Sequence, residues 1–288
     1  MRSVTHPGRG GGVHLLEGGG AGPPVWLVHG LDSSAASWLD VAPGLVDDHR
    51  VQAVDLPGFG RSSVGRHRRS LPAHADLVAE MIRHHADDAV VLAGTSMGAI
   101  VAMLAASRHP GAVAALVLLT PALPRRTTGG LDAGYSPLLI ASAAPGMLAL
   151  EPWRRSFLPA DERVRTLVAA YTADDSERPS PATFTAMAAA DETRTRWDRI
   201  RGWSGAARSM FWWLARPDAY HGAADAVHVP VTLVEGLQDP VLPRPVVSAT
   251  LERHPGWQRV SLAGVGHLPQ LERPAAVADT IRAVTGVR

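Results

Sequence analysis

The chain alternates between short apolar runs and longer stretches in which apolar residues recur every three or four positions. The longer stretches predict helices at Ser70–His85, Met97–Arg108, Arg244–His254 and Pro274–Thr285. The short runs predict buried strands at Val25–His29, Val51–Asp55, Ala89–Ala93, Val113–Leu119 and Val231–Glu235, with a further strand expected at Arg259–Ala263. Apolar strands that alternate with helices are typical of a parallel sheet covered on both faces.

This alternation stops between about Pro121 and Val227. The stretch has helical and loop patterns, many prolines and five of the eight Trp residues. We therefore expect an α/β fold with a mostly parallel central sheet flanked by helices, interrupted by a helical insertion after the strand that ends near Leu119. The expected domains are a core of residues 1–120 and 228–288 and a cap of residues 121–227. The glycines around Gly18–Gly20 are expected to form a hairpin loop or flexible turn.

Composition narrows the possible functions. Hydrophobic residues make up 46% and charged residues 19% of 288 residues, which is typical of a globular protein, and the net charge of +1 gives no electrostatic case for nucleic acid. The chain has no Cys, Lys or Asn, which excludes a thiol nucleophile, Cys-ligated zinc and a Lys Schiff base. We expect no cofactor, no metal, no signal peptide and no membrane span, hence a cytoplasmic protein. The oligomeric state is left open.

One short motif carries candidate chemistry. Gly94-Thr-Ser-Met-Gly98 lies between the strand pattern VVLA and the helix pattern AIVAMLAASRH. It fits the G-x-S-x-G turn that exposes a nucleophilic serine at a strand-to-helix junction. The motif alone is weak evidence because the chain has 28 Gly, but its context is the one that the motif requires. Such a serine also needs a base, an acid that orients the base, and N–H donors for the oxyanion.

Four further segments supply candidates for these parts. His29–Trp38 resembles the oxyanion loop of α/β-hydrolases, and Asp55–Ser62 resembles their D-x-P-G-x-G-x-S turn. Val231–Leu242 is similar to their strand and acid loop, and Gly264–Pro274 is similar to their histidine loop. With the serine motif, the chain resembles serine hydrolases of the α/β-hydrolase superfamily over residues of about 13–120 and 228–288. The resemblance implies the α/β-hydrolase fold, in which the insertion follows the sixth strand and forms a helical cap over the serine.

The resemblance implies a role for each matching residue. Ser96 would be the nucleophile, His267 the general base and then acid, and Asp239 the group that orients His267. The backbone N–H groups of Leu31 and Met97 would form the oxyanion hole. The implied activity is cofactor-free hydrolysis of a carboxylic ester, thioester or lactone with an apolar portion, through an acyl-enzyme intermediate.

Neighbouring polar residues have competing interpretations. Glu235, at the end of the same strand, is the nearby substitute for Asp239 as the acid. His29 is interpreted as a structural residue that ties the oxyanion loop to its neighbours. Asp32 is interpreted either as a solvated loop residue or as a contact to a polar part of the substrate. The Arg125-Arg126 and Arg154-Arg155 pairs are expected on solvated faces.

The expected substrate is a small molecule with an apolar group, bound in a pocket where core and cap meet. Candidate pocket residues are Asp32, Trp38, Trp212, Trp213 and Leu268. Neighbours on a helix point about 100° apart, so one of Trp212 and Trp213 should pack inward while the other is a candidate for the cavity.

Other functions remain open on the same residues. Carbon–carbon bond hydrolases of this superfamily are similar, but those compared carry an aromatic residue after the catalytic His, where this chain has Leu268. Acyl transfer to an acceptor other than water and a receptor-like binding role also stay open. Ser96 at the nucleophile position argues against dehalogenases and epoxide hydrolases, and the absence of Lys argues against hydroxynitrile lyases.

Overall fold

The computed structural model describes residues 1–8, 10–124, 147–173 and 179–286. These residues build one eight-stranded sheet, in the order β1-β2-β4-β3-β5-β6-β7-β8. The pairs β1/β2 and β2/β4 are antiparallel, and every other neighbouring pair is parallel. The strands are β1 (Arg2–Gly8), β2 (Gly11–Gly19), β3 (Pro24–Val28), β4 (Arg50–Val54), β5 (Val90–Thr95), β6 (Val113–Leu119), β7 (Val231–Gly236) and β8 (Gln258–Leu262).

The helices fall into two groups along the chain. Those that alternate with the strands are α1 (Leu71–His85), α2 (Met97–Arg108), α9 (Arg244–Arg253), α10 (Pro269–Glu272) and α11 (Pro274–Thr285). Those between β6 and β7 are α4 (Met147–Arg155), α5 (Ala160–Tyr171), α6 (Pro181–Glu192), α7 (Arg196–Leu214) and α8 (Pro217–Asp225). The prediction of a mostly parallel sheet with a helical insertion after the sixth strand is confirmed. Its division into separate core and cap domains stays a prediction.

The first two strands form a hairpin that the hydrophobic pattern did not predict. Gly18 and Gly19 were expected in a loop, but they pair with Val51 and Arg50 at the end of β2. Backbone hydrogen bonds to β4 hold this glycine-rich segment extended although it has little side-chain surface to bury. Gly19 has a φ of +90°, and a Cβ there would collide with the carbonyl of His49, so glycine is required at this point.

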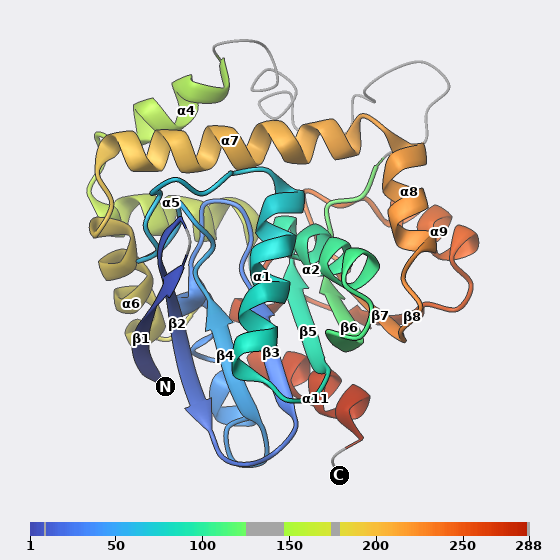
Figure 1. Cartoon of the computed structure of the whole chain (residues 1–288). Helices are drawn as coiled ribbons and strands as arrows, with labels where there is room; N and C mark the ends of the chain where they lie inside the picture. The colour runs from blue at the N-terminus through green and yellow to red at the C-terminus, as the bar shows by residue number, and fades with distance from the viewer. Residues whose placement is uncertain (9, 125–146, 174–178, 287–288) are drawn as a thin grey trace.

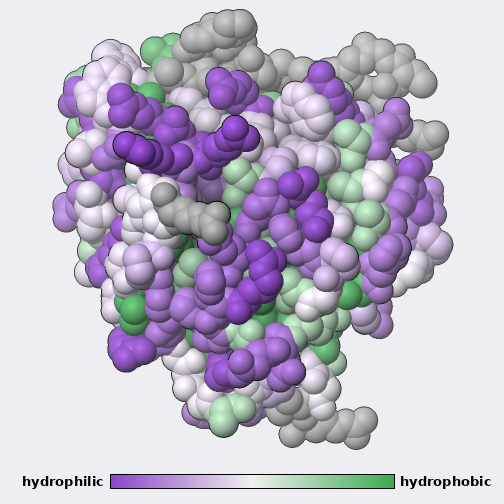
Figure 2. Space-filling view, in the orientation of Figure 1, coloured by the Kyte–Doolittle hydropathy of each residue, from purple (hydrophilic) through white to green (hydrophobic). Residues whose placement is uncertain are grey.

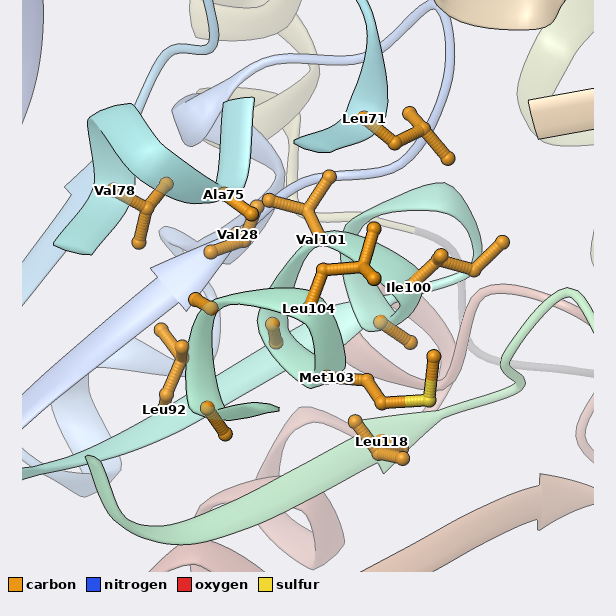
Figure 3. Packing of buried hydrophobic residues seen from close by; sticks show 14 of the residues in the cluster. Val28, Leu71, Ala75, Val78, Leu92, Ile100, Val101, Met103, Leu104 and Leu118 are labelled. Carbon is orange, nitrogen blue, oxygen red and sulfur yellow. The ribbon is translucent and has the colours of Figure 1, made fainter. Parts of the chain in front are cut away.

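Two hydrophobic clusters, one on each face of the sheet, form the core. Helices α1 and α2 cover one face and α11 the other (Figure 1). Figure 3 shows Val101 and Leu104 of α2 between α1 and the sheet, near Val28 of β3 and Leu92 of β5. Helix α2 has ten buried residues among twelve, which explains why its sequence is apolar all round rather than amphipathic.

The insertion lies at the carboxyl ends of the parallel strands. In Figure 1, the long helix α7 crosses this end of the sheet, and α4 lies over α7. In parallel α/β sheets, ligands bind at the carboxyl ends of the strands. The insertion therefore covers the part of the fold where a binding site is expected.

The face of the molecule drawn in Figure 2 is mixed in character. Hydrophilic side chains cover much of the face in Figure 2, and hydrophobic groups lie between them in small patches. Within the described ranges, none of the helices combines the length and apolar character needed to cross a bilayer.

Candidate active site

Ser96 lies at a sharp turn between β5 and α2. Its φ of +52° and ψ of −114° are unusual for a residue with a side chain, and such strain persists only where the surroundings enforce it. The two flanking glycines allow the turn to close. A Cβ on Gly94 would overlap the carbonyl of Gly98, and a Cβ on Gly98 would overlap the carbonyls of Val28 and His29. Close packing therefore requires glycine at both flanking positions, so that α2 can lie against β3 with Ser96 at the turn.

A hydrogen-bonded chain joins Ser96 to a histidine and a carboxylate. Nε2 of His267 lies 3.0 Å from Oγ of Ser96, and its Nδ1 lies 2.7 Å from Oδ2 of Asp239. The other oxygen of Asp239 accepts from the backbone N–H groups of Val241 and Leu242, at 2.7 and 2.9 Å. Because the carboxylate can only accept, Nδ1 carries the proton and Nε2 is free to accept from Ser96.

The alternative acid, Glu235, is bound elsewhere. One oxygen of its carboxylate accepts from Nε of Arg259 at 2.8 Å and from the hydroxyl of Ser261 at 2.7 Å. Both partners lie on β8, so Glu235 links two neighbouring strands. The contact to His267 is made by Asp239 instead.

Glu272 holds the histidine loop and was not predicted from the sequence. Its buried carboxylate accepts from the backbone N–H groups of Gly266 at 2.8 Å and Leu268 at 2.9 Å, one on each side of His267. It also accepts from the N–H of Ala173 in the insertion, at 2.9 Å. Glu272 is the last residue of the short helix α10, and a single acidic residue there gives no sequence signal that distinguishes it from a solvated one, so only the tertiary structure identifies this contact.

His29 fixes the loop that follows β3. Its Nε2 accepts from the N–H of Leu56 at 3.1 Å, and its Nδ1 lies 2.7 Å from the carbonyl oxygen of Gly30, to which it donates. Full burial lowers the pKa of His29, so the ring is neutral and suited to donate at one nitrogen and accept at the other. The predicted structural role of His29 is confirmed.

Asp55 anchors the D-x-P-G-x-G-x-S turn. Burial alone would raise the pKa of Asp55, but a 2.7 Å hydrogen bond to His14 and backbone N–H groups from Ala35 and Arg61 lower it. Nε2 of His14 lies 2.7 Å from Oγ of Ser3, so Ser3, His14 and Asp55 repeat the connectivity of Ser96, His267 and Asp239. Ser3, however, is exposed on β1 and lines neither cavity described below. The cavity, more than the three-residue geometry, distinguishes Ser96.

The two residues expected to donate to an oxyanion occupy different places: Met97 directly follows Ser96, and Leu31 lies in the loop after β3. Met97 is the first residue of α2, where backbone N–H groups have no partner within the helix and the helix dipole favours negative charge. Met97 is fully buried and is not among the residues that line the cavity beside Ser96, so its place as a donor stays a prediction. Leu31 lies in the loop after β3 and lines the same cavity as Ser96.

A cavity of about 450 Å³ opens above Ser96 and His267. This volume falls in the range that binds a small organic ligand. Most of its lining is apolar and comes from both the sheet side and the insertion: Leu31, Leu123, Leu167, Trp203, Met210, Leu214, Leu242, Val246 and Leu268. The arrangement can hold an apolar group next to a hydrogen-bonded serine.

The structure places the five candidate pocket residues differently. Asp32 and Leu268 line the cavity. Trp38 is fully buried in the core cluster beside α11, because the short helix Ala35–Trp38 turns it toward the opposite face of the sheet. Trp213 packs against the core, and Trp212 is 45% exposed beneath the guanidinium of Arg216.

The aromatic residue that α7 does bring to the cavity is Trp203. It shares this lining with Met210 and Leu214, seven and eleven positions further along the helix. These spacings return to the same helix face after two and three turns, whereas Trp212 and Trp213 lie on other faces. The sequence spacing places these three residues on one face of α7, but the tertiary structure determines that this face meets the cavity.

Arg155 is not on the solvated face that its sequence predicted. Its Nη1 donates to Oδ2 of Asp32 at 2.5 Å, and its side chain is 16% exposed. Asp32 is thereby half-buried in an ion pair at the cavity, not free in solvent, and its φ is +59°. Arg154 is exposed as expected. The Arg125-Arg126 pair lies outside the described residues.

Sequence comparisons identify the fold family. A family model described as the alpha/beta hydrolase fold matches residues 23–274. Over 86% of this chain and 88% of the relative, the sequence is 29% identical to the pimeloyl-[acyl-carrier protein] methyl ester esterase of Sodalis glossinidius. Some matches are partial. One such match is to the dihydrolipoyllysine-residue acetyltransferase component of the acetoin cleaving system of Pseudomonas putida. The two sequences are 37% identical over 105 residues, which are 36% of this chain and 28% of that relative.

Solved structures show the same architecture over nearly the whole chain. A thermophilic esterase from Thermogutta terrifontis matches with a TM-score of 0.74 and 25% identity, covering 98% of this chain and 97% of that chain. The thioesterase domain from the curacin biosynthetic pathway matches with a TM-score of 0.71 and 22% identity, covering 98% of each chain. The matched family model spans most of the strands, the insertion and the serine, acid and histidine loops. The chain belongs to the α/β-hydrolase family.

Proposed function

We propose that this protein is a serine hydrolase that cleaves a carboxylic ester, thioester or lactone with an apolar portion. The observation that carries the proposal is the hydrogen-bonded chain from Ser96 through His267 to Asp239, which begins in a largely apolar cavity of about 450 Å³. A serine hydroxyl becomes an effective nucleophile when such a base accepts its proton. The esterase relative supports an ester as the bond that is cleaved.

In the first half-reaction, Oγ of Ser96 attacks the carbonyl carbon of the substrate. Its proton passes to Nε2 of His267, and the resulting imidazolium keeps its hydrogen bond to the charged Asp239. The carbonyl oxygen becomes an oxyanion and accepts from the backbone N–H groups of Leu31 and Met97. The intermediate then collapses, His267 returns the proton to the leaving alcohol or thiol, and the acyl group stays on Ser96.

In the second half-reaction, water attacks the acyl-enzyme. His267 accepts a proton from this water, a second tetrahedral intermediate forms, and its collapse releases the carboxylic acid. The proton returns from His267 to Oγ of Ser96, which restores the starting state. This sequence needs no redox step and no group beyond the chain and water.

The apolar lining sets the expected preference for substrate. Each buried methylene contributes about 0.8 kcal/mol, so kcat/KM should rise by up to about fourfold per methylene until the cavity is filled. Leu167, Trp203 and Met210 line the cavity that the acyl chain of the substrate would occupy.

An ester panel tests the proposal. We expect p-nitrophenyl esters from acetate upward to be hydrolysed with rising kcat/KM, and Ser96→Ala to abolish turnover while the protein stays folded. Ser3→Ala is the matched control, because Ser3 has the same hydrogen-bond connectivity away from the cavity. A Ser96→Ala variant that is folded and still turns over these esters would refute the proposal. A steep fall of kcat/KM beyond acetate would refute the apolar cavity as the acyl site.

A further inference from the structure

Four arginines of the insertion lie together beside the cavity that contains Ser96. We refer to Arg155, Arg163, Arg194 and Arg199 as the arginine cluster. Nη2 of Arg155 donates to the carbonyl of Arg163 at 2.8 Å, and Nη1 of Arg199 donates to the carbonyl of Arg194 at 2.6 Å. The cluster thus joins the end of α4, the first half of α5 and the start of α7.

The cluster carries more positive than negative charge. Within the part of the chain that the structure describes, its ion pairs are made with two carboxylates. Asp32 pairs with Arg155, and Asp191 pairs with both Arg163 and Arg194. Among the described residues, Arg199 bonds only to backbone carbonyls, those of Asp191 and Arg194, so the four guanidinium groups exceed the two carboxylates by two positive charges. Such an excess is costly away from water, and Arg163 and Arg194 are each only 8% exposed.

Several donors of the cluster have no acceptor. The Nε–H groups of Arg155, Arg194 and Arg199 are buried and make no hydrogen bond. Each buried unsatisfied donor costs free energy, and the cost is larger when the donor belongs to a charged group. The unpaired donors and the excess positive charge both favour an additional anion.

A small cavity lies among these side chains. It has a volume of about 20 Å³ and is lined by Arg155, Arg163 and Arg194 together with both carboxylates. A space of roughly 10–15 Å³ holds one water molecule, so this one accommodates one or two oxygen atoms. That size suits the two oxygens of a carboxylate better than the four of a phosphate.

The small cavity adjoins the catalytic one. Asp32 and Arg155 line both, together with Ser33 and Leu167. A substrate whose ester lies at Ser96 can therefore extend a chain along the apolar lining until its far end reaches Arg155. Asp32 is the internal anion that occupies this arginine in the absence of substrate.

We infer that the arginine cluster is a subsite for a carboxylate at the far end of the acyl chain, so that the preferred substrates are half-esters of dicarboxylic acids. The inference rests on the proposed ester hydrolysis and adds the chemical class of the acyl group. Arg155, which lines both cavities, is the residue of the cluster that contacts the substrate carboxylate from the catalytic cavity. Asp32 competes with the substrate carboxylate for Arg155.

Two matched ester series test this inference. One series is the neutral p-nitrophenyl alkanoates of four to eight carbons, and the other is the mono-p-nitrophenyl esters of dicarboxylic acids of the same lengths. The readout is the ratio of kcat/KM for the half-ester to that for the neutral ester of equal length. A charge-assisted contact should give a ratio of about ten or more at one or more chain lengths.

The variants should move this ratio in opposite directions. Arg155→Met should lower it at least about tenfold, because the contact is lost and Asp32 becomes an unpaired negative charge. Asp32→Asn should raise it by about threefold or more, because the competing anion is removed. Arg201→Met is the control, since Arg201 is an exposed arginine of α7, and it should change the ratio by less than about twofold. A structural role alone would lower both series together and leave the ratio unchanged.

A measurement on the unmodified protein keeps the test independent of variant folding. Adipate should inhibit hydrolysis of a neutral ester at a concentration at least about tenfold lower than hexanoate or inorganic phosphate. A half-ester ratio below one at every length, or equal inhibition by adipate and hexanoate, would overturn the inference while ester turnover persists. Failure to hydrolyse either series would instead overturn the proposed function and the inference with it.

Discussion

Replacing Asp239 by Asn tests whether Asp239, rather than a neighbouring acidic residue, is the acid of the proposed triad. In the structure, Oδ1 of Asp239 accepts two backbone N–H groups while Oδ2 faces Nδ1 of His267. Asn has one acceptor oxygen, and the two backbone donors require it. The NH₂ group must then face Nδ1, and His267 can pair with it only by moving its own proton to Nε2. In that tautomer, Nε2 no longer accepts the proton of Ser96.

The size of the effect follows from these contacts. The variant loses a charge-assisted hydrogen bond, worth about 1.5–3 kcal/mol, and the stabilisation of the imidazolium in the transition state. A total of about 3–5 kcal/mol corresponds to a loss of 10²–10⁴ in kcat. In a serine protease, the same exchange costs about 10⁴.

The assay is kcat for a short neutral ester at neutral pH, with folding checked by circular dichroism. Glu235→Gln is the matched control, since it removes the same charge from a neighbouring buried acid that contacts Arg259 and Ser261 rather than His267. We expect it to lower kcat by less than about tenfold. Activity of Asp239→Asn should partly return at high pH, where hydroxide helps to deprotonate Ser96. If Glu235→Gln is the more damaging of two well-folded variants, Asp239 is not the acid.

Two further predictions concern the scaffold around the site. Glu272→Gln should lower the free energy of unfolding by roughly 1–3 kcal/mol and reduce kcat, because its carboxylate holds the backbone on both sides of His267. Urea unfolding and ester kinetics measure both effects, with the exposed Glu252→Gln as the control. Equal effects of the two substitutions would contradict this role of Glu272. Burial lowers the pKa of His74 to about 3, so the unfolded chain binds a proton below about pH 6.5 that the folded protein does not, and stability is lost as the pH falls from there toward 3. As the pH falls from 8 to 5, the free energy of unfolding of His74→Leu should therefore rise by on the order of 2 kcal/mol relative to that of the wild type, measured by urea unfolding. A difference between the two proteins that does not change with pH would refute the lowered pKa of His74.

The sequence predicted those features that depend on neighbouring residues. The helix at Met97–Arg108 has its observed bounds, because a glycine-flanked serine precedes it and His109-Pro110 follows it. The serine and acid loops each follow a buried apolar strand, so their place at one end of a parallel sheet follows from the pattern, whereas the strand before the histidine loop, β8, is mostly polar and exposed. The order of the motifs along the chain then identified the family.

The features that escaped prediction depend on contacts between distant residues. The hairpin of β1 and β2 is stabilised by pairing with β4 and has too many glycines to show a clear two-residue period. Trp38 and Trp212 occur where pocket aromatics were expected, but the turn of their helices sends one into the core and the other to the surface. Arg155 resembles any surface arginine until α4 is placed beside Asp32.

The most direct test of the central claim is to identify the residue that a fluorophosphonate modifies. After incubation and proteolysis, mass spectrometry locates the covalent adduct. We predict one adduct per chain, on the peptide that contains Ser96, with none in Ser96→Ala and an unchanged yield in His14→Ala, which breaks the similar arrangement at Ser3. An adduct on Ser3 or another serine, with Ser96 unmodified in the folded protein, would contradict the account.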